Sequence, residues 1–379
     1  MGLRSHFRSL RVFVVALLLM IPLTGILSGQ AFVVNGGNWL MTEQDTSGGS
    51  LDGGFPWTSG GTIFSNTQGA TALGMVRAYE RTGNASFLNS AVEAGDFIVG
   101  GYGGLSSGTW TNGDPRFATH DLLFLEALSV ASGDNQYSNY AQTWFWDKLA
   151  TSSYGNSNLD AAGYGSGVVT NRTGQGLVEL APWDLSKTAI AAHEAGETSI
   201  RDDLMDNILT ALESTTVGDT DFDLHGLAGG IWASIVTGED LDPTAGRYAS
   251  SDSTQDLIDE LLNYQSVNGG FVFNSTADVN DGSNASTQVT AFALLALNAA
   301  DPVTYASEID DALTYLANVQ QGDGQILVAP GASPTSAGGV EVHGEALEAY
   351  SVSIPEPSAL IVFPLVGAVA VLRRRNRKN

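Results

Sequence analysis

The chain contains no cysteine, so neither a disulfide nor a thiolate metal site can form. Basic residues are scarce in its central part. Residues 32–354 hold eight Lys and Arg against 40 Asp and Glu, a net charge of −32. Such a surface repels nucleic acid and other polyanions and attracts divalent cations. We therefore expect no nucleic-acid partner.

The other basic residues gather at the two ends of the chain. Arg4, Arg8 and Arg11 precede an apolar run over 12–27, and small residues follow at Gly29 and Ala31. This order is typical of a secretory signal peptide and predicts one over 1–31, cleaved after Ala31. A retained anchor helix is the alternative, although the apolar run is short for a membrane span.

The C-terminal end, "IPEPSALIVFPLVGAVAVLRRRNRKN" from Ile354, places a second apolar stretch before a basic cluster. The stretch over 359–372 contains Pro364 and is shorter than the roughly 20 residues of a stable span. Basic residues after it favour a cytoplasmic position for the extreme C-terminus. Both ends therefore indicate that the acidic body is exported.

This ending resembles the PEP-CTERM sorting signal of exported bacterial proteins. The resemblance rests on Pro355, Glu356 and Pro357, the apolar segment after them, and the cluster of Arg373, Arg374 and Arg375. It implies that residues 354–379 form a short transmembrane sorting helix, tethered transiently in the inner membrane and removed by an exosortase-type enzyme. It also implies an exopolysaccharide-producing host and delivery of the body to the outer envelope or beyond. An ordinary C-terminal anchor predicts the same side of the membrane.

Glycine marks a repeat in the body. "QDTSGGS" begins at Gln44, "QSVNGGF" at Gln265 and "QQGDGQI" at Gln320, at spacings close to multiples of about 55 residues. A fixed period of this size is typical of repeat architectures. The segment before each Gln is amphipathic, as over 303–320, whereas the segment after each polar loop is apolar on all sides, as over 285–299. Each unit therefore predicts an outer helix and a buried inner helix.

Six units of this kind fit the chain. Outer segments are predicted near 32–44, 84–99, 135–150, 199–214, 252–265 and 303–320, and inner ones near 66–82, 116–132, 182–195, 223–237, 285–299 and 339–352. The body starts with an outer segment and ends with an inner one, so these two can pair and close a ring. We predict an all-α fold, an (α/α)6 toroid of six helical hairpins over 32–353. An open α-solenoid is the alternative.

The stretch from Gln265 to Phe271 resembles the repeat of terpenoid-cyclase and protein-prenyltransferase toroids. There the Gln amide caps the next helix and the aromatic stacks on it; Ser50 and Ile326 replace the aromatic in the other copies. The resemblance extends to the fold only. The chain lacks an Asp-x-Asp-Asp acid, a cysteine zinc ligand and the basic residues that diphosphate binding requires.

Polar residues collect at the predicted starts of the inner helices, which rim one mouth of a toroid. They include His343, Asp121, Asp221 and Glu341. The candidates for catalysis among them are Asp184, Asp223, His225, His120 and Glu345. Two such carboxylates can act as acid and base on a glycosidic bond, and histidine can relay a proton or bind a metal. The simpler interpretations favour Asp184 as a helix N-cap and each histidine as a capping or surface residue.

Trp57, Trp110 and Trp183 are predicted in loops or at helix starts, where they would stack on sugar rings; Trp144 and Trp146 are expected in the core. The metal ligands stay unassigned. Calcium is the candidate ion, because "DTDFDLHG" and "DVNDGSN" are similar to calcium loops, but both lack the glycine at position six and the glutamate at position twelve.

Two functions remain open for this body. We favour an exported glycan-binding or scaffold toroid, because no recognised motif places a pair of carboxylates. The alternative is a carbohydrate-active enzyme, either a glycoside hydrolase or a polysaccharide lyase, with paired carboxylates at the mouth. For the enzyme, the expected substrate is a polysaccharide that is neutral or bridged by calcium, because the body has few cations for binding uronates. A neutral polysaccharide is therefore the candidate partner.

Overall fold

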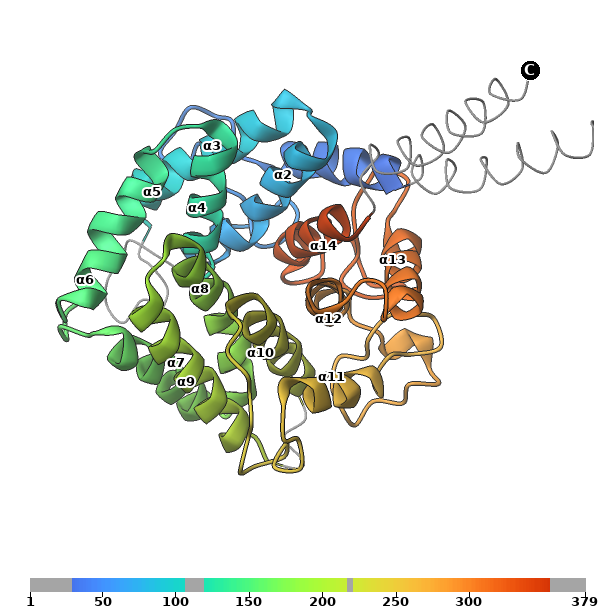
Figure 1. Ribbon diagram of the computed structural model, residues 1–379. Helices are drawn as coiled ribbons and strands as arrows, with labels where there is room; N and C mark the ends of the chain where they lie inside the picture. The colour runs from blue at the N-terminus through green and yellow to red at the C-terminus, as the bar shows by residue number, and fades with distance from the viewer. Residues whose placement is uncertain (1–28, 106–118, 217–220, 355–379) are drawn as a thin grey trace, which may run out of the picture.

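The computed structural model describes residues 29–105, 119–216 and 221–354 (Figure 1). These residues form helices joined by loops; within them, β-pairing is limited to isolated bridges such as the one between Gln265 and Phe271. The predicted all-α class is confirmed.

Six helices form the inner ring. They are α2 (Gln68–Thr82), α4 (Asp121–Ser132), α8 (Ala181–Ala195), α10 (Asp223–Thr237), α12 (Thr287–Ala300) and α14 (Gly339–Ser353). Each packs against the next in this order, and α14 packs against α2 (Figure 1). The ring is closed, which confirms the toroid and excludes the open solenoid.

The outer layer surrounds this ring. It contains a helix over 29–43, α3 (Ala85–Val99), α5 (Gln136–Ala141) continued through a π-turn into α6 (Asp147–Ala150), α9 (Thr198–Ser214), α11 (Thr254–Leu262) and α13 (Ala306–Val319). The amphipathic stripe read from the sequence faces the core; in α13 it buries Ile309, Ala312 and Leu316.

One outer helix was not predicted. α7 (Ala161–Gln175) lies between α6 and α9 and packs mainly on α9. Its sequence, "AAGYGSGVVTNRTGQ", is poor in large apolar residues and rich in glycine, so it reads as a loop. Gly165 shows why glycine is tolerated here, since a Cβ would lie 2.6 Å from Nδ2 of Asn207 on α9. The outer layer therefore has one helix more than six hairpins require.

The Gln–Gly repeat is a structural device that joins successive outer helices. In each copy the Gln amide donates two hydrogen bonds of 2.9 to 3.2 Å, one to the carbonyl of a turn glycine and one to a carbonyl of the next outer helix. The bonds run from Gln44 to Gly53 and Ser90, from Gln265 to Gly269 and Glu308, and from Gln320 to Gly324 and Phe32. The even Gln–Gly spacing predicts Gly48 as the turn glycine of the first copy. In the structure it is Gly53.

The last of these bonds closes the outer layer. Phe32 on the first helix also stacks on Tyr350 of α14, with ring centroids 3.8 Å apart. Trp39 stacks on His343 at 4.5 Å, and the imidazole of His343 accepts from the Ile326 N–H and is 3.0 Å from the Gly36 carbonyl. His343, a mouth candidate by sequence, thus joins the two ends of the domain.

Glycine also brings the inner helices close together. At the junction of α14 and α2, a Cβ on Gly344 would lie 2.5 Å from Cα of Thr71, and a Cβ on Gly74 would overlap the carbonyl of Gly344. A Cβ on Gly226 of α10 would likewise overlap the carbonyl oxygen of Glu179, just before α8. At these junctions the backbones of neighbouring inner elements are therefore in direct contact.

None of the described helices is long and apolar enough to cross a membrane. The predicted sorting motif and its apolar segment, and residues 1–28 of the predicted signal peptide, lie outside the described residues. The first helix includes Gly29, so it begins before the predicted cleavage point after Ala31.

Candidate active site

A pocket of about 200 Å³ lies at the N-terminal ends of inner helices α2, α4, α8 and α14. Its lining comprises Trp57, Asn66, Thr119, His120, Arg172, Trp183, Asp184 and Glu341. Four residues nominated from the sequence, namely Trp57, His120, Trp183 and Asp184, therefore share one pocket. Glu345 lies one helical turn beyond Glu341, and Trp110 falls outside the described residues.

Of the two glutamates of α14, Glu341 lines the pocket, and Glu345 is buried one helical turn further along the helix. Glu341 accepts a 3.1 Å hydrogen bond from Trp57 Nε1, and the fully buried Glu345 accepts one of 2.7 Å from Gln288 Nε2. The other oxygen of Glu345, Oε1, is buried without a hydrogen bond. Burial raises the pKa of both carboxyl groups; the charge of Asp184 adds to the rise for Glu341, and the charge of Glu341 adds to the rise for Glu345. The pair therefore holds a proton more tightly than carboxyl groups in water do.

A buried cation lies below the pair. Lys187 Nζ of α8 is 2.8 Å from Glu348 Oε2 and 3.9 Å from Glu345 Oε1, and all three side chains are almost fully buried. Its charge limits the rise in the pKa of Glu341 and Glu345. Sequence reasoning missed Lys187 and Glu348. The available signal was the placement of glutamates at 341, 345 and 348, one stripe of a helix predicted to be buried.

His120 precedes α4 and faces the same carboxylates. Its Nε2 is 3.3 Å from the Trp183 carbonyl, which can only accept, so Nε2 carries the hydrogen. Nδ1 then faces Glu345 Oε1 at 3.9 Å. Burial, together with the charge of Lys187, lowers the pKa of His120 well below its usual range. The imidazole is therefore neutral, with the lone pair of Nδ1 directed at the glutamates.

Asp184 occupies the opposite wall, in the first turn of α8. Both of its oxygens accept from Arg172 of α7, at 2.5 and 2.8 Å. α8 starts at Ala181, and Asp184 does not cap it, so the N-cap interpretation is wrong. Burial raises the pKa of Asp184, and the hydrogen bonds from Arg172 oppose that rise. Arg172 was missed because its helix was missed.

Asp223 and His225 are placed elsewhere. Asp223 accepts from Arg247 Nη1 at 2.6 Å and from the backbone and hydroxyl of Ser275, so it ties two loops to the start of α10 outside the pocket lining. His225 is buried with Nε2 3.2 Å from Gln288 Oε1, and Gln288 in turn holds Glu345. His225 therefore contacts the cluster only through Gln288.

Trp57 and Trp183 present different surfaces. Trp57 is 38% exposed at the rim and stands edge-to-face with Phe64, which is 45% exposed. Trp183 is more enclosed and packs edge-on against His120. An exposed indole beside buried carboxylates is suited to a sugar ring, whose apolar face stacks on aromatic rings while its hydroxyls bind polar groups.

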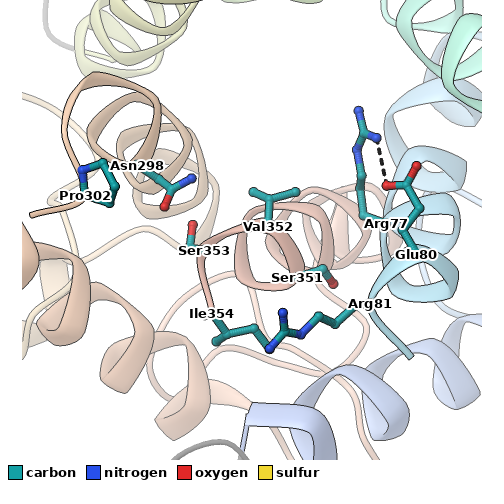
Figure 2. A pocket seen from close by; sticks show the side chains of 9 residues that line it. All are labelled: Arg77, Glu80, Arg81, Asn298, Pro302, Ser351, Val352, Ser353 and Ile354. Atoms are coloured by element: carbon teal, nitrogen blue, oxygen red, sulfur yellow. Dashed lines mark hydrogen bonds and ion pairs between the residues drawn. The ribbon is translucent and has the colours of Figure 1, made fainter. Parts of the chain in front are cut away.

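A larger cavity of about 520 Å³ lies at the other end of the ring, where α2, α12 and α14 terminate (Figure 2). Its lining includes Arg77, Arg81 and Asn298 together with the last residues of α14. Glu80 is its one carboxylate and is paired with Arg77 at 2.9 Å. This cavity therefore has no second carboxylate in its lining, whereas the pocket at the other end of the ring has Asp184 and Glu341.

One group of described residues has donor atoms arranged for a metal ion. His120, Glu341 and Glu345 each offer one such atom, all within 4.8 Å of one another. Of the two calcium loops considered from the sequence, one begins at Asp219, outside the described residues. In the other, Asp278 Oδ1 is already engaged by Asn280.

No protein-family model matches the chain, and its sequence matches none of the curated proteins. Solved structures do share its fold. An α-1,6-mannanase of glycoside hydrolase family 76 from Salegentibacter sp. HEL1_6 is 12% identical, with a TM-score of 0.56 over 86% of this chain and 98% of the mannanase. A polysaccharide lyase is 13% identical, with a TM-score of 0.53 over 86% and 97%. A family 88 glycosyl hydrolase from Bacteroides vulgatus is 14% identical, with a TM-score of 0.50 over 76% and 92%.

At these identities the likeness establishes the fold alone. An inactive variant of the mannanase, in complex with α-1,6-mannotriose, has asparagine at two consecutive aspartates. This chain has consecutive aspartates at Asp202–Asp203 and Asp310–Asp311, which lie on outer helices α9 and α13. Neither pair lines the pocket described above.

Proposed function

We propose that the protein is a carbohydrate-active enzyme that hydrolyses a glycosidic bond of a neutral polysaccharide in the pocket between α8 and α14. The observation that carries this is the pair of carboxylates on opposite walls, Glu341 and Asp184, beside the exposed Trp57. The fold-level likeness to glycoside hydrolases and a polysaccharide lyase supports catalysis over the scaffold role favoured from the sequence.

The two carboxylates have different environments and hence different roles. Glu341, whose pKa is raised, protonates the leaving glycosidic oxygen as its bond to the anomeric carbon breaks. Asp184 takes a proton from the water attacking that carbon, and its ion pair with Arg172 favours the ionised form that this role requires. Trp57 holds Glu341 through its indole N–H and offers its exposed face to the sugar.

A hydrolase fits better than a lyase. Lyases act on uronates, whose carboxylate must be neutralised by a cation. The cation on the pocket wall, Arg172, already has two hydrogen bonds to Asp184, and Lys187 below it is paired with Glu348. The described pocket therefore offers a uronate no cation without a partner.

We propose further that the enzyme is exported and sorted by its PEP-CTERM-like tail, through an exosortase-type partner, to the outer envelope or the extracellular matrix. The substrate is then the exopolysaccharide of the host. Mass spectrometry of the C-terminus of protein isolated from cells tests this step, and an intact Asn379 on protein recovered outside the cells would contradict it.

The activity is tested by release of reducing ends from the exopolysaccharide of the host and from a panel of neutral glycans that includes α-1,6-mannan. Glu341→Gln should lower kcat/KM by roughly 10²- to 10⁴-fold, as expected when a general acid is removed. Asp184→Asn should be similarly impaired. Glu93→Gln, the same change on the exposed surface of α3, should retain activity. Binding without release by the unmodified protein would overturn hydrolysis and favour a glycan-binding role.

A further inference from the structure

We propose that His120, Glu341 and Glu345 form a binding site for one divalent transition-metal ion, with zinc as the ion best suited, at the floor of the pocket. This proposal does not depend on glycan cleavage.

The three donor atoms lie within 4.8 Å of one another, and two of the side chains are held from behind. The Trp183 carbonyl orients His120 by accepting from Nε2, which leaves Nδ1 facing the glutamates. A backbone carbonyl holding the far nitrogen of an imidazole is the usual outer-shell partner of a metal-bound histidine. Gln288 holds Glu345 in the same manner by one oxygen, while Oε1, buried and without a hydrogen bond, faces His120.

The buried cluster carries a net negative charge that a divalent cation would neutralise. Around neutral His120 lie the cation Lys187 and the carboxylates Glu341, Glu345 and Glu348, which leaves two negative charges when all three are ionised. Uncompensated charge is costly in a buried setting, so the cluster requires either protons or a metal ion. Lys187 is paired with Glu348 at 2.8 Å and lies 3.9 Å from Glu345 Oε1, so its single charge compensates only part of the negative charge of the cluster.

One nitrogen and two carboxylate oxygens suit zinc, which takes three protein ligands and leaves a fourth position open to solvent or substrate. Calcium prefers six to eight oxygen ligands and is disfavoured by the imidazole. The donor atoms, within 4.8 Å of one another, must move closer to reach zinc bonds of roughly 2.0–2.2 Å. Glu341 is only partly buried and can make this movement.

Zinc and the proton of Glu341 compete for the same carboxylate. In the hydrolase proposed above, zinc is therefore an inhibitor, because Glu341 bound to a metal cannot protonate a leaving group. The two proposals can fail separately: cleavage that persists in a chelator without any zinc binding supports the first alone, and zinc binding without cleavage supports the second alone.

The test uses the full chain, stripped with a chelator and then titrated with zinc chloride by equilibrium dialysis. We expect one high-affinity zinc per chain. His120→Asn and Glu345→Gln should each weaken binding by at least about 10-fold, since even outer-shell changes reach that size. His193→Asn, a histidine at the far end of α8, should leave binding unchanged. Equal zinc affinity in all four proteins would overturn the site.

Anomalous scattering from zinc-soaked crystals of the unmodified chain provides a test that needs no variant. A peak between His120 and Glu345 is the expected result. A peak only elsewhere on the acidic surface, or none, would refute the assignment even if a variant fails to fold.

Discussion

Closure of the inner ring depends on a contact that only glycine permits, and Gly344→Ala tests it. The new Cβ would lie 2.5 Å from Cα and 2.6 Å from the carbonyl oxygen of Thr71, so backbone rather than a movable side chain opposes it. Overpacking of this kind costs about 1–3 kcal/mol, and sometimes more, whereas replacing glycine in a helix by alanine returns about 1 kcal/mol. Because backbone atoms oppose the Cβ, we expect the upper end of this range to apply, a net destabilisation of about 2 kcal/mol.

The assay is urea unfolding followed by circular dichroism, with Gly174→Ala as the matched control. Gly174 lies in α7 with open space where its Cβ would be, so this substitution should stabilise by about 0.5–1 kcal/mol. Gly74→Ala disrupts the same α2–α14 contact from the other side, and the double variant should cost less than the sum of the two. If Gly344→Ala matches or exceeds the wild-type midpoint while Gly174→Ala behaves as expected, the close approach of α2 and α14 is wrong.

Three further predictions concern buried groups. Lys187→Met should lower the free energy of unfolding by about 3–5 kcal/mol, measured by urea unfolding, because Glu348 loses its buried partner. The control, Lys148→Met on the outer layer, should change stability little. Equal effects of the two substitutions would contradict the buried pair. Phe32→Ala should cost about 3–5 kcal/mol, because the first helix loses its stack on α14; an unchanged melting temperature would refute closure through that helix. Burial lowers the pKa of His225 to about 4. Between pH 6.5 and 4 the unfolded chain therefore binds a proton at this histidine that the folded chain does not bind, so the stability of the fold decreases as the pH is lowered. His225→Gln should flatten this pH dependence, and an identical pH profile for the variant would show that His225 titrates normally.

The fold could be predicted from the sequence because the patterns that indicate each helix are local. The stripe through Ile309, Ala312 and Leu316 and the apolar segment over 285–299 each record the burial of one helix, and neither requires knowledge of its neighbours. The exception is α7, whose glycines suit a close contact with α9 but predict a loop when read alone.

The site was readable only in part. Placement at the starts of inner helices indicated His120, Asp184 and Trp183, because all such starts rim one mouth. The same rule also indicated Asp223, which Arg247 and Ser275 engage outside the pocket. Position along a helix places a residue at one end of the ring but does not say whether its side chain faces the axis or a neighbouring loop.

The amino-acid sequence by itself determined the number and order of the inner helices, the acidic character of the body and the absence of thiol chemistry, since periodicity and composition are properties of consecutive residues. Tertiary structure alone decided which charges meet. Lys187 and Glu348 are 161 positions apart and Trp57 and Glu341 are 284 apart, and they come together only because the ring closes. Burial at that meeting point, which no local pattern encodes, raises the pKa of the glutamates, and the Trp183 carbonyl orients His120 toward Glu345.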